Sequence, residues 1–254
     1  MKVAERHKKI LTLIKGQPCT IEDMAITLAV SPVTVRRDLS RLAEQGLLTR
    51  TLGGAAPSVG VAERSLEQRA NFAKEEKRRI AEAAVAHIQP KQTLFLDSGT
   101  SAGALADVIA EQALSLPRLT IVTASLSVAS KLCEVAPIRL ILLGGELRRL
   151  SQGMLGPLAE RALESLTFDI AFLSGDALSA IHGIGETEPS QTRLKELIMR
   201  KSTHTIALGH ADKLNRVDTH HWATLPIGSV IITDVTGAFM EEVFQQNGHT
   251  LVSV

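Results

Sequence analysis

Short apolar runs that alternate with helical segments constrain the fold of this chain more than any other feature of its sequence. From residue 93 onward each run is four or five residues long, and helical spacing of apolar residues marks segments between several of them. Such runs are typical of a parallel sheet that helices cover on both faces. The predicted strands are 93–96, 119–123, 139–143, 169–173, 205–208 and 230–233, and the predicted helices are 101–110, 126–135, 191–202 and 238–246.

The residues directly after these strands are candidate ligand-binding residues, because open α/β sheets bind ligands beyond the carboxyl ends of their strands. The first strand is followed by Asp97-Ser98-Gly99-Thr100-Ser101, which leads straight into a helix. Glycine permits a tight turn, and hydroxyls together with free backbone N–H groups at a helix start form an anion site. The same residues are typical of an ordinary helix cap, so only their place at the first strand–helix turn favours the anion site.

Later strand ends carry further candidates. After the third strand, Gly144 and Gly145 allow a ligand to approach the backbone closely. Arg148 follows them and offers a guanidinium that can hold phosphate through two hydrogen bonds. The remaining candidates at strand ends are Thr123, Ser125, Asp176 and Lys213.

A second strong signal lies in residues 31–46, which the sequence marks as one helix. Ser31 is a favoured N-cap, Pro32 suits the first helical position and Gly46 suits the residue past the end. Apolar residues at spacings of four and three form one stripe that faces a core. The polar and basic residues are mostly off that stripe and suit contacts with DNA phosphates or base edges: Ser31, Thr34, Arg36, Arg37, Ser40 and Arg41.

The flanking segments favour DNA binding over an ordinary solvated helix. Thr20 caps a preceding helix, and a short turn at 29–30 joins the two into a helix-turn-helix. A short strand over 47–52 and the glycines Gly53 and Gly54 then predict a hairpin wing, with Arg50 placed for a phosphate or the minor groove. Residues 1–50 carry nine basic and five acidic residues, a net charge of +4, whereas the remainder carries −3. A basic head on a mildly acidic body indicates a polyanionic partner for the head.

This amino-terminal region resembles the DeoR-type family of bacterial repressors. The recognition-helix signature of that family is Ser-x-x-Thr-x-Arg-Arg-Asp-Leu, which residues 31–39 match. Gly46, Arg50 and the Gly-Gly-Ala of residues 53–55 match the elements that follow, whereas Leu52 stands where a His usually precedes the glycines. The resemblance implies a DNA-binding repressor, most simply of a carbohydrate-utilisation operon, that binds operator DNA.

The resemblance extends over nearly the whole chain, since the effector domain of that family shares its fold with ribose-5-phosphate isomerase. It implies that residues 97–100 form a phosphate loop, that Gly144, Gly145 and Arg148 close the site, and that Lys213 ends a characteristic turn. The implied effector is a phosphorylated sugar or polyol. The chain departs from the family pattern around the sugar, which leaves that sugar unidentified: the departures are Ala124, Gln191, Arg193 and His210.

The predicted organisation is an amino-terminal winged helix-turn-helix domain over 1–56, a linker over 57–75, and a Rossmann-like, mostly parallel α/β effector domain over 76–254. An amphipathic helix over 74–88 opens the last domain, and we interpret its basic residues 77–79 as a solvated face. One short recognition helix reads too little DNA to select a site alone. A homo-oligomer, a dimer or a tetramer, is therefore expected, with the apolar segments 230–233 and 250–254 as the source of its interface.

The main alternative is a sugar-phosphate isomerase fused to a DNA-binding head. Such an isomerase needs a carboxylate base near the carbon that loses its proton. The isomerase pattern after the equivalent strand is Gly-Ala-Asp-Glu, whereas this chain has Ser174-Gly175-Asp176-Ala177 and lacks the Glu. We therefore interpret the chain as a sensor and not an enzyme. Glu186 and Glu188 follow nearby, in a loop that the sequence does not place.

Three further expectations come from what the sequence lacks. No Gly-x-Gly-x-x-Gly follows a strand, and the eight histidines show no metal-ligand spacing, so no nucleotide cofactor and no metal is expected. Cys19 and Cys133 lie far apart and are expected to be reduced thiols. With no signal peptide and no apolar run long enough to cross a membrane, the sequence predicts a cytoplasmic protein.

Overall fold

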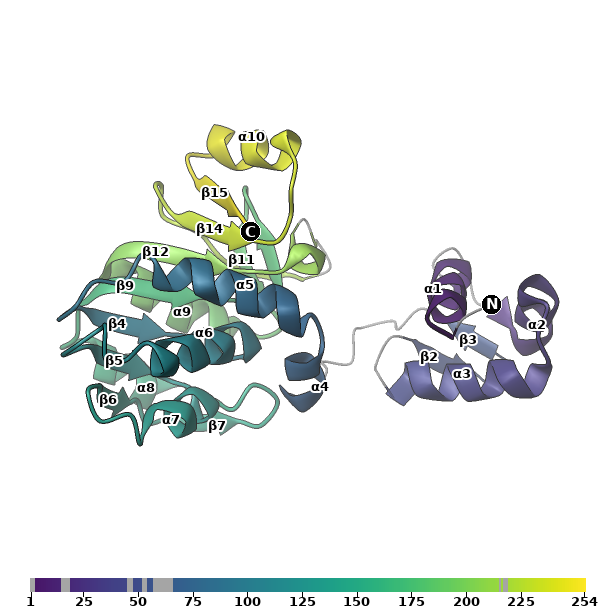
Figure 1. The fold of residues 1–254 in the computed structure, drawn as a ribbon, viewed down its shortest axis with the longest axis horizontal. Helices are drawn as coiled ribbons and strands as arrows, with labels where there is room; N and C mark the ends of the chain where they lie inside the picture. Colours follow the sequence, from purple (N-terminus) through teal and green to yellow (C-terminus); the bar gives the residue numbers. More distant parts are fainter. Residues whose placement is uncertain are drawn as a thin grey trace. The chain divides into compact units, whose positions relative to one another are not determined.

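A computed structural model of the chain describes residues 3–14, 19–44, 48–51, 54–56, 66–214, 216 and 219–254. The chain divides into two compact units, Met1–Gln68 and Arg69–Val254 (Figure 1). The division falls inside a short helix, α4 (Leu66–Asn71). Residues 69–75, which we predicted to be the end of the linker, therefore belong to the second unit, while residues 57–65 lie outside the described residues.

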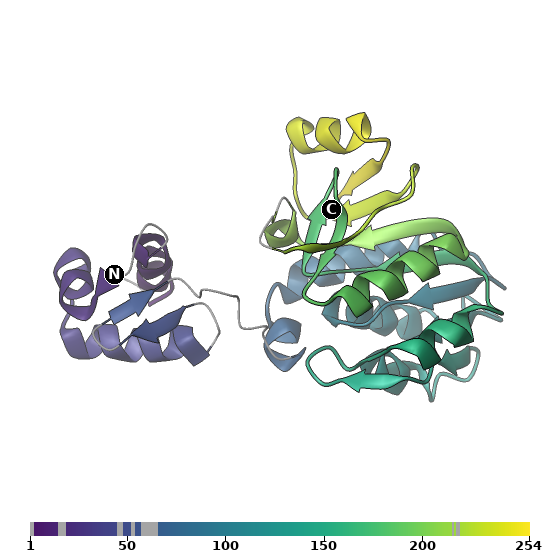
Figure 2. The same cartoon turned by 180° about the vertical axis from the view of Figure 1, so that it is seen from behind.

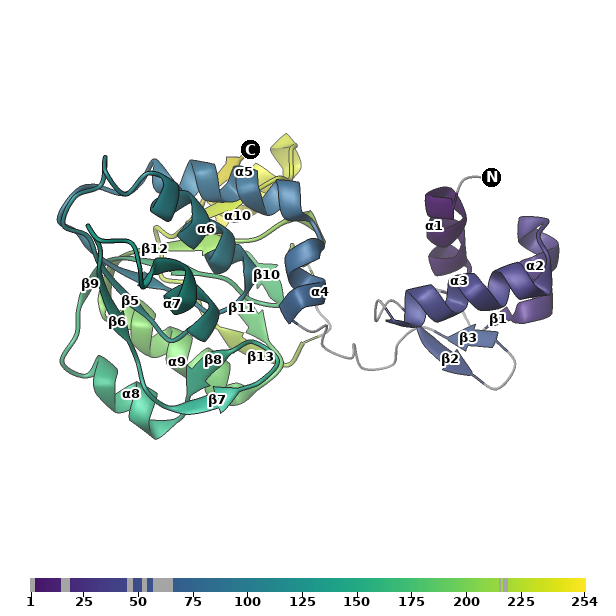
Figure 3. The same cartoon turned by 60° about the horizontal axis from the view of Figure 1, so that its bottom comes forward.

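The described part of the first unit holds three helices and a small antiparallel sheet, which confirms the predicted winged helix-turn-helix (Figure 3). The side chains of Thr20 and Ser31 accept hydrogen bonds from the N–H groups three residues on, at 3.1 and 3.2 Å, so both predicted caps form. The elements are α1 (Val3–Ile14), β1 (Cys19–Thr20), α2 (Ile21–Leu28), α3 (Pro32–Glu44), β2 (Thr49–Thr51) and β3 (Gly54–Ala56).

The candidate recognition helix α3 is fixed to the unit by apolar and charged contacts. Its stripe of Val35, Leu39 and Leu42 is buried in the core of the unit. Asp38 is also buried, and its carboxylate accepts a hydrogen bond at 3.1 Å from Arg6 of α1. Burial alone would raise the pKa of Asp38, but Arg6 and the neighbouring His7 together hold it below its ordinary value. A charged Asp38 therefore ties α3 to α1.

The second unit is built on a seven-stranded sheet in which every neighbouring pair is parallel. The chain enters in the middle, builds outward to one edge, and then returns to the other side of its first strand. In sheet order the strands are β15 (Thr250–Ser253), β14 (Val230–Thr233), β12 (Ser202–Leu208), β9 (Phe168–Leu173), β4 (Thr93–Leu96), β5 (Thr120–Thr123) and β6 (Arg139–Leu142). The topology confirms the predicted Rossmann-like α/β class, with its switch point between β4 and β9.

Helices cover both faces of this sheet. One face carries α5, α6 and α7, whose apolar side chains share a core with β4 and β5 (Figure 1). The opposite face carries α8 and α9, and α10 joins the same second core (Figure 2). The bounds are α5 (Lys74–Val85), α6 (Thr100–Glu111), α7 (Leu126–Leu132), α8 (Pro157–Leu163), α9 (Pro189–Arg200) and α10 (Ala238–Gln246).

Several short elements that the sequence did not predict lie beyond the carboxyl ends of the main strands. A two-stranded hairpin packs beside the end of β5, where Met154 donates a backbone hydrogen bond to Ala124. A three-stranded antiparallel sheet follows the end of β9. The bounds are β7 (Glu146–Arg148) and β8 (Gly153–Leu155) for the hairpin, β10 (Ala177–Ser179), β11 (Gly183–Glu186) and β13 (His221–Ala223) for the sheet, and η1 (Ala211–Lys213) for a 3₁₀ turn.

Two expectations about surfaces are wrong. Lys77 is not part of a solvated face, because only 3% of it is exposed and its ammonium donates to backbone carbonyls of Arg69 and Phe72. Val230–Thr233 cannot supply an oligomer interface, because β14 lies between β12 and β15 and is mostly buried. The edge strand β15 remains half-exposed. Among the described residues, no helix has the length and apolarity needed to cross a membrane.

Candidate functional site

The candidate site begins at the switch point of the sheet, where the chain continues past the neighbouring strands β4 and β9. Asp97 follows β4, and its backbone N–H donates to Phe172 of β9 at 3.0 Å. The Asp97 carboxylate in turn accepts hydrogen bonds from the N–H groups of Ser98, at 2.7 Å, and Ser174, at 2.9 Å. Asp97 therefore fastens the two strand ends together at the point where ligands bind in sheets of this kind.

Three buried charges lie directly behind this junction. The ammonium of Lys195, in α9, pairs with Asp97 and lies 3.0 Å from the carboxylate of Glu186, at the end of β11. Gln191 donates to the other Glu186 oxygen at 2.9 Å. Each of the three charged residues is at most 4% exposed. Both oxygens of Asp97 are thus committed to the protein itself, in place of the ligand contact that we predicted.

Burial and neighbouring charges shift the pKa values of Glu186 and Lys195. Burial raises the pKa of Glu186 to about 7, and although Lys195 opposes that rise, Asp176 and Asp97 add to it. Burial alone would lower the pKa of Lys195, but the carboxylates of Asp97 and Glu186 hold it above its ordinary value. Lys195 therefore stays charged, while Glu186 changes its charge near neutral pH.

The loop at 98–101 presents an open helix start. Gly99 is the N-cap of α6, at φ 107°, and has no side chain to accept from the N–H groups of the first turn. Ser101 is 2% exposed, and its hydroxyl has no hydrogen-bond partner among the described residues. Unmatched donors at the amino terminus of a helix are the groups that bind phosphate. The loop therefore has the local features that an anion site requires. The binding of an anion there stays a prediction.

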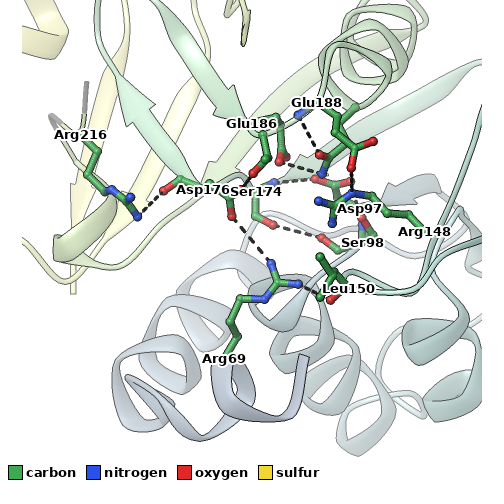
Figure 4. Close-up of polar contacts among 12 residues, drawn as sticks. Arg69, Asp97, Ser98, Arg148, Leu150, Ser174, Asp176, Glu186, Glu188 and Arg216 are labelled. Carbon is green, nitrogen blue, oxygen red and sulfur yellow. Dashed lines mark hydrogen bonds and ion pairs between the residues drawn. The ribbon is translucent and has the colours of Figure 1, made fainter. Parts of the chain in front are cut away.

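The hairpin brings Arg148 next to this loop (Figure 4). Arg148 in β7 pairs in register with Gly153 in β8. A Cβ on Gly153 would come within 2.9 Å of the Ser98 hydroxyl, so the hairpin lies directly against the loop. The Arg148 side chain is 8% exposed, and its Nε donates to the carboxylate of Glu188 at 2.8 Å. The predicted phosphate-binding guanidinium thus lies beside the loop with an internal carboxylate as its partner.

The two predicted glycines before this arginine have different roles. Gly145 adopts φ +153°, and a Cβ there would lie 2.6 Å from the carbonyl oxygen of Leu155. Gly145 is therefore required by the packing of the hairpin on itself. A Cβ on Gly144 would meet no atom within 4 Å, so the space beside Gly144 is open.

Asp176, after β9, marks another side of the site. Its carboxylate accepts a hydrogen bond from the Thr187 hydroxyl at 2.8 Å and lies 3.8 Å from the guanidinium of Arg69 (Figure 4). Burial lowers the pKa of Lys213 in η1, although the carboxylates of Asp176 and Glu186 oppose that shift. The predicted contacts of Asp176 and Lys213 with a ligand stay predictions.

Two predicted ligand residues are used elsewhere. Ser125 is the N-cap of α7, where its hydroxyl accepts from the N–H of Val128 at 3.3 Å. The hydroxyl of Thr123 accepts from the N–H of Ser125 at 3.0 Å. Both side chains are fully buried. Their hydroxyls satisfy the chain's own backbone, so they are helix-start residues and not part of the open site.

Sequence reasoning assigned no role to four charged residues that organise the site: Arg69, Glu186, Glu188 and Lys195. Lys195 had a usable signal, because it falls in a buried helical stripe that also contains the apolar residues Leu194 and Ile198. A charge in a buried stripe needs a buried partner. Arg69 had no such signal, since it precedes the sheet by a whole helix and lies in the stretch that we predicted to be linker.

The predicted DNA-contacting residues lie largely on one exposed side of α3. Arg36, Arg37 and Arg41 are exposed, and so is Ser31 at the N-cap, where its hydroxyl lies 2.9 Å from that of Thr34. Thr34 and Ser40 are half-buried. Val33 of the same helix is 70% exposed but was not among the residues predicted to contact DNA. An apolar side chain at the start of such a helix can contact a thymine methyl.

The wing glycine Gly54 serves the sheet itself. A Cβ there would lie 1.9 Å from the Cys19 carbonyl, so the close backbone approach at Gly54 is to β1 and not to a partner outside. Arg50 lies in β2, of which the structure describes the backbone. Gly46, Leu52 and Gly53 lie outside the described residues. Within the described ranges, no group of His, Cys, Asp and Glu side chains could hold a metal ion.

Comparison with known proteins identifies both units. A family model described as a DeoR-like helix-turn-helix domain matches residues 6–58, and one described as a DeoR C terminal sensor domain matches residues 73–235. The chain is 32% identical to the glycerol-3-phosphate regulon repressor of Escherichia coli K12, over 92% of each chain. It is also 32% identical to the HTH-type transcriptional regulator GlpR of Haloferax volcanii, over 98% of this chain and 97% of that one.

Solved structures that share part of the fold include a D-ribose-5-phosphate isomerase in complex with phospho-erythronic acid. It is 15% identical, with a TM-score of 0.43 over 56% of this chain and 54% of the isomerase.

Proposed function

The chain belongs to the DeoR family of transcriptional regulators, and we propose that a phosphorylated sugar or polyol binds its sensor domain and releases its amino-terminal unit from operator DNA. The protein then acts as a repressor, most simply of a carbohydrate-utilisation operon, in the cytoplasm. Relatives of this length are named as transcriptional regulators, which supports a sensor and not an enzyme.

The observation that carries the proposal is the open start of α6. Its first-turn N–H groups have no capping side chain, and the Ser101 hydroxyl is buried without a partner among the described residues. Leaving such donors unsatisfied costs free energy that a bound phosphate would recover. Thr100 and Ser98 add hydroxyls at the same turn, and Arg148 adds a positive charge on the adjoining hairpin.

The rest of the ligand is recognised by the side of the site that carries Asp176. A carboxylate accepts hydrogen bonds from sugar hydroxyls, and the Asp176 side chain is 26% exposed and so can meet a ligand. Lys213 adds a second positive charge near it. A compound with a phosphate at one end and hydroxyls at the other therefore matches the charges of the two sides.

We also propose that the protein binds operator DNA as a dimer or a tetramer. The α3 surface with its exposed arginines is small, and two half-sites are the usual way in which one helix per subunit selects a sequence. The half-exposed edge strand β15 is the part of the predicted interface that remains available in the subunit.

A thermal-shift screen tests the effector proposal. The full chain is melted with phosphorylated sugars and polyols, including glycerol 3-phosphate because one relative is named for that regulon, and with their unphosphorylated counterparts. We expect only phosphorylated compounds to raise the melting temperature, because the site is built around an anion. Thr100→Val should weaken the best compound by roughly tenfold, since it removes one hydrogen bond to a charged group at nearly constant volume.

Thr203→Val is the matched control, because Thr203 is an exposed threonine in β12 on the amino side of that strand. The control should keep the full shift. Equal shifts for phosphorylated and unphosphorylated compounds, or an undiminished shift in Thr100→Val, would show that the phosphate does not bind at this loop.

A further inference from the structure

Helix α4 is attached to the sensor unit by polar contacts and not by a core. Its six residues include no buried side chain, and a helix of that length is unstable on its own in water. Lys77 of α5 donates to the carbonyls of Arg69 and, at 2.5 Å, Phe72. The Phe72 ring packs edge-on against His210, with 5.5 Å between ring centres. The guanidinium of Arg69 provides a further attachment.

Two partners of that guanidinium, Leu150 and Asp176, belong to the walls of the candidate site (Figure 4). Arg69 Nη2 donates to the carbonyl of Leu150 at 2.6 Å, in the hairpin turn two residues past Arg148. Arg69 Nη1 lies 3.8 Å from the carboxylate of Asp176, which follows β9. Arg69 therefore spans the hairpin that carries the predicted phosphate ligand and the strand end that carries the predicted hydroxyl ligand.

The contact between Arg69 and Asp176 is a long ion pair. A separation of 3.8 Å is longer than a hydrogen bond, so Arg69 and Asp176 attract one another without forming one. A phosphate bound at the start of α6 adds a second anion to which the same guanidinium can donate. The side chains of Arg69 and Asp176 are 21% and 26% exposed, so their interaction is weakly screened by solvent.

We propose that Arg69 is a residue of the effector site and that it couples occupancy of the site to the docking of α4. The inference rests on the proposed function, because it needs an anion at the start of α6. The bound anion draws the guanidinium of Arg69 inward and fastens α4 to the sensor unit. In the chain, α4 directly follows residues 57–65, which come after the helix-turn-helix. Binding of the anion therefore restrains the chain at the carboxyl end of that segment.

Hydrogen exchange on the full chain tests this coupling. Exchange of the α4 backbone amides is followed in sodium chloride, in inorganic phosphate and in glycerol 3-phosphate at matched ionic strength. We expect slower exchange of α4 in phosphate for the wild type and no change for Arg69→Gln. Arg69→Gln should also bind phosphate roughly tenfold more weakly, because one charge-assisted hydrogen bond is lost.

Two further variants separate coupling from simple loss of structure. Arg69→Lys keeps the charge and should recover part of both effects. Arg79→Gln, on an exposed position of α5, should behave as the wild type. Unchanged or faster exchange of α4 on phosphate binding, with the melting temperature still raised by phosphate, would overturn the coupling alone. If neither phosphate compound raises the melting temperature or alters exchange in any variant, the anion site and the coupling are both contradicted.

Discussion

At the scale of single residues, the buried cluster of Lys195, Asp97 and Glu186 decides the charge of the site. Two carboxylates share one ammonium, and Asp97 is also held by two backbone N–H groups. Burial disfavours the charged form of Glu186, so its pKa rises to about 7. Protonation of Glu186 makes the site less negative, so an anionic effector should bind more tightly in mildly acidic solution than in alkaline solution.

The raised pKa of Glu186 also predicts a pH-dependent stability. Between its ordinary value of 4.5 and about 7, the folded chain binds a proton at Glu186 that the unfolded chain releases. That stabilisation is fully present below 4.5 and is lost as the pH rises through about 7. Glu186→Gln removes the titration and keeps the volume. The free energy of unfolding of the variant, relative to the wild type, should therefore increase as the pH rises and then level off.

Urea unfolding of both chains at a series of pH values measures this difference, and the linear extrapolation gives each free energy. Glu160→Gln serves as the control, because it makes the same change at a carboxylate outside the buried cluster, paired at 2.8 Å with Arg193, whose side chain is 70% exposed. If the unfolding free energies of the wild type and Glu186→Gln run parallel across neutral pH, the raised pKa of Glu186 is contradicted.

At the scale of elements, several strands and helices of the core could be predicted from the sequence, because buried segments are rich in apolar residues. The strands at 93–96 and 230–233 and the helix at 238–246 have the predicted bounds, because a strand covered on both faces must be apolar throughout. The strand β9 begins one residue earlier than predicted, at Phe168, and the helix predicted at 191–202 spans Pro189–Arg200.

The short strands around the site were not predicted from the sequence. The strands β7, β8, β10 and β13 are three residues long, too short for a pattern of alternating apolar and polar residues. Their positions depend on contacts between distant residues, such as the bond from Arg69 to Leu150. For the same reason the strand ends could not show that the hydroxyls of Thr123 and Ser125 accept hydrogen bonds from the chain's own backbone.

The helix α3 could be predicted from the sequence because its capping residues and its apolar stripe are local signals. Arg37 is exposed, and the buried pair of Asp38 and Arg6 beside it fixes the orientation of the helix. Arg37→Ala should weaken binding to a selected operator by about 1–3 kcal/mol if the guanidinium contacts a base. Arg79→Ala, in the other unit, is the control. An unchanged footprint of Arg37→Ala at matched salt would place Arg37 outside the interface.

At the scale of the whole molecule, one unit carries the DNA-binding surface and the other carries the effector site. A ligand that loosens DNA binding must itself bind less well to the DNA-bound protein, by the same factor. A ligand that binds both states equally shifts nothing, however tightly it binds. The sensor unit must therefore differ between the two states near the ligand, and Arg69 with α4 is the proposed place.

We propose that a phosphate held at the start of α6 controls DNA binding. This is tested by the affinity of the full chain for its selected operator, with and without the compound that most raises the melting temperature. The compound should lower the operator affinity of the wild type. Thr100→Val should bind the operator as tightly as the wild type in its absence, yet need about tenfold more compound for release. Release of Thr100→Val at the same concentration of compound as the wild type would contradict control of DNA binding by a phosphate at this loop.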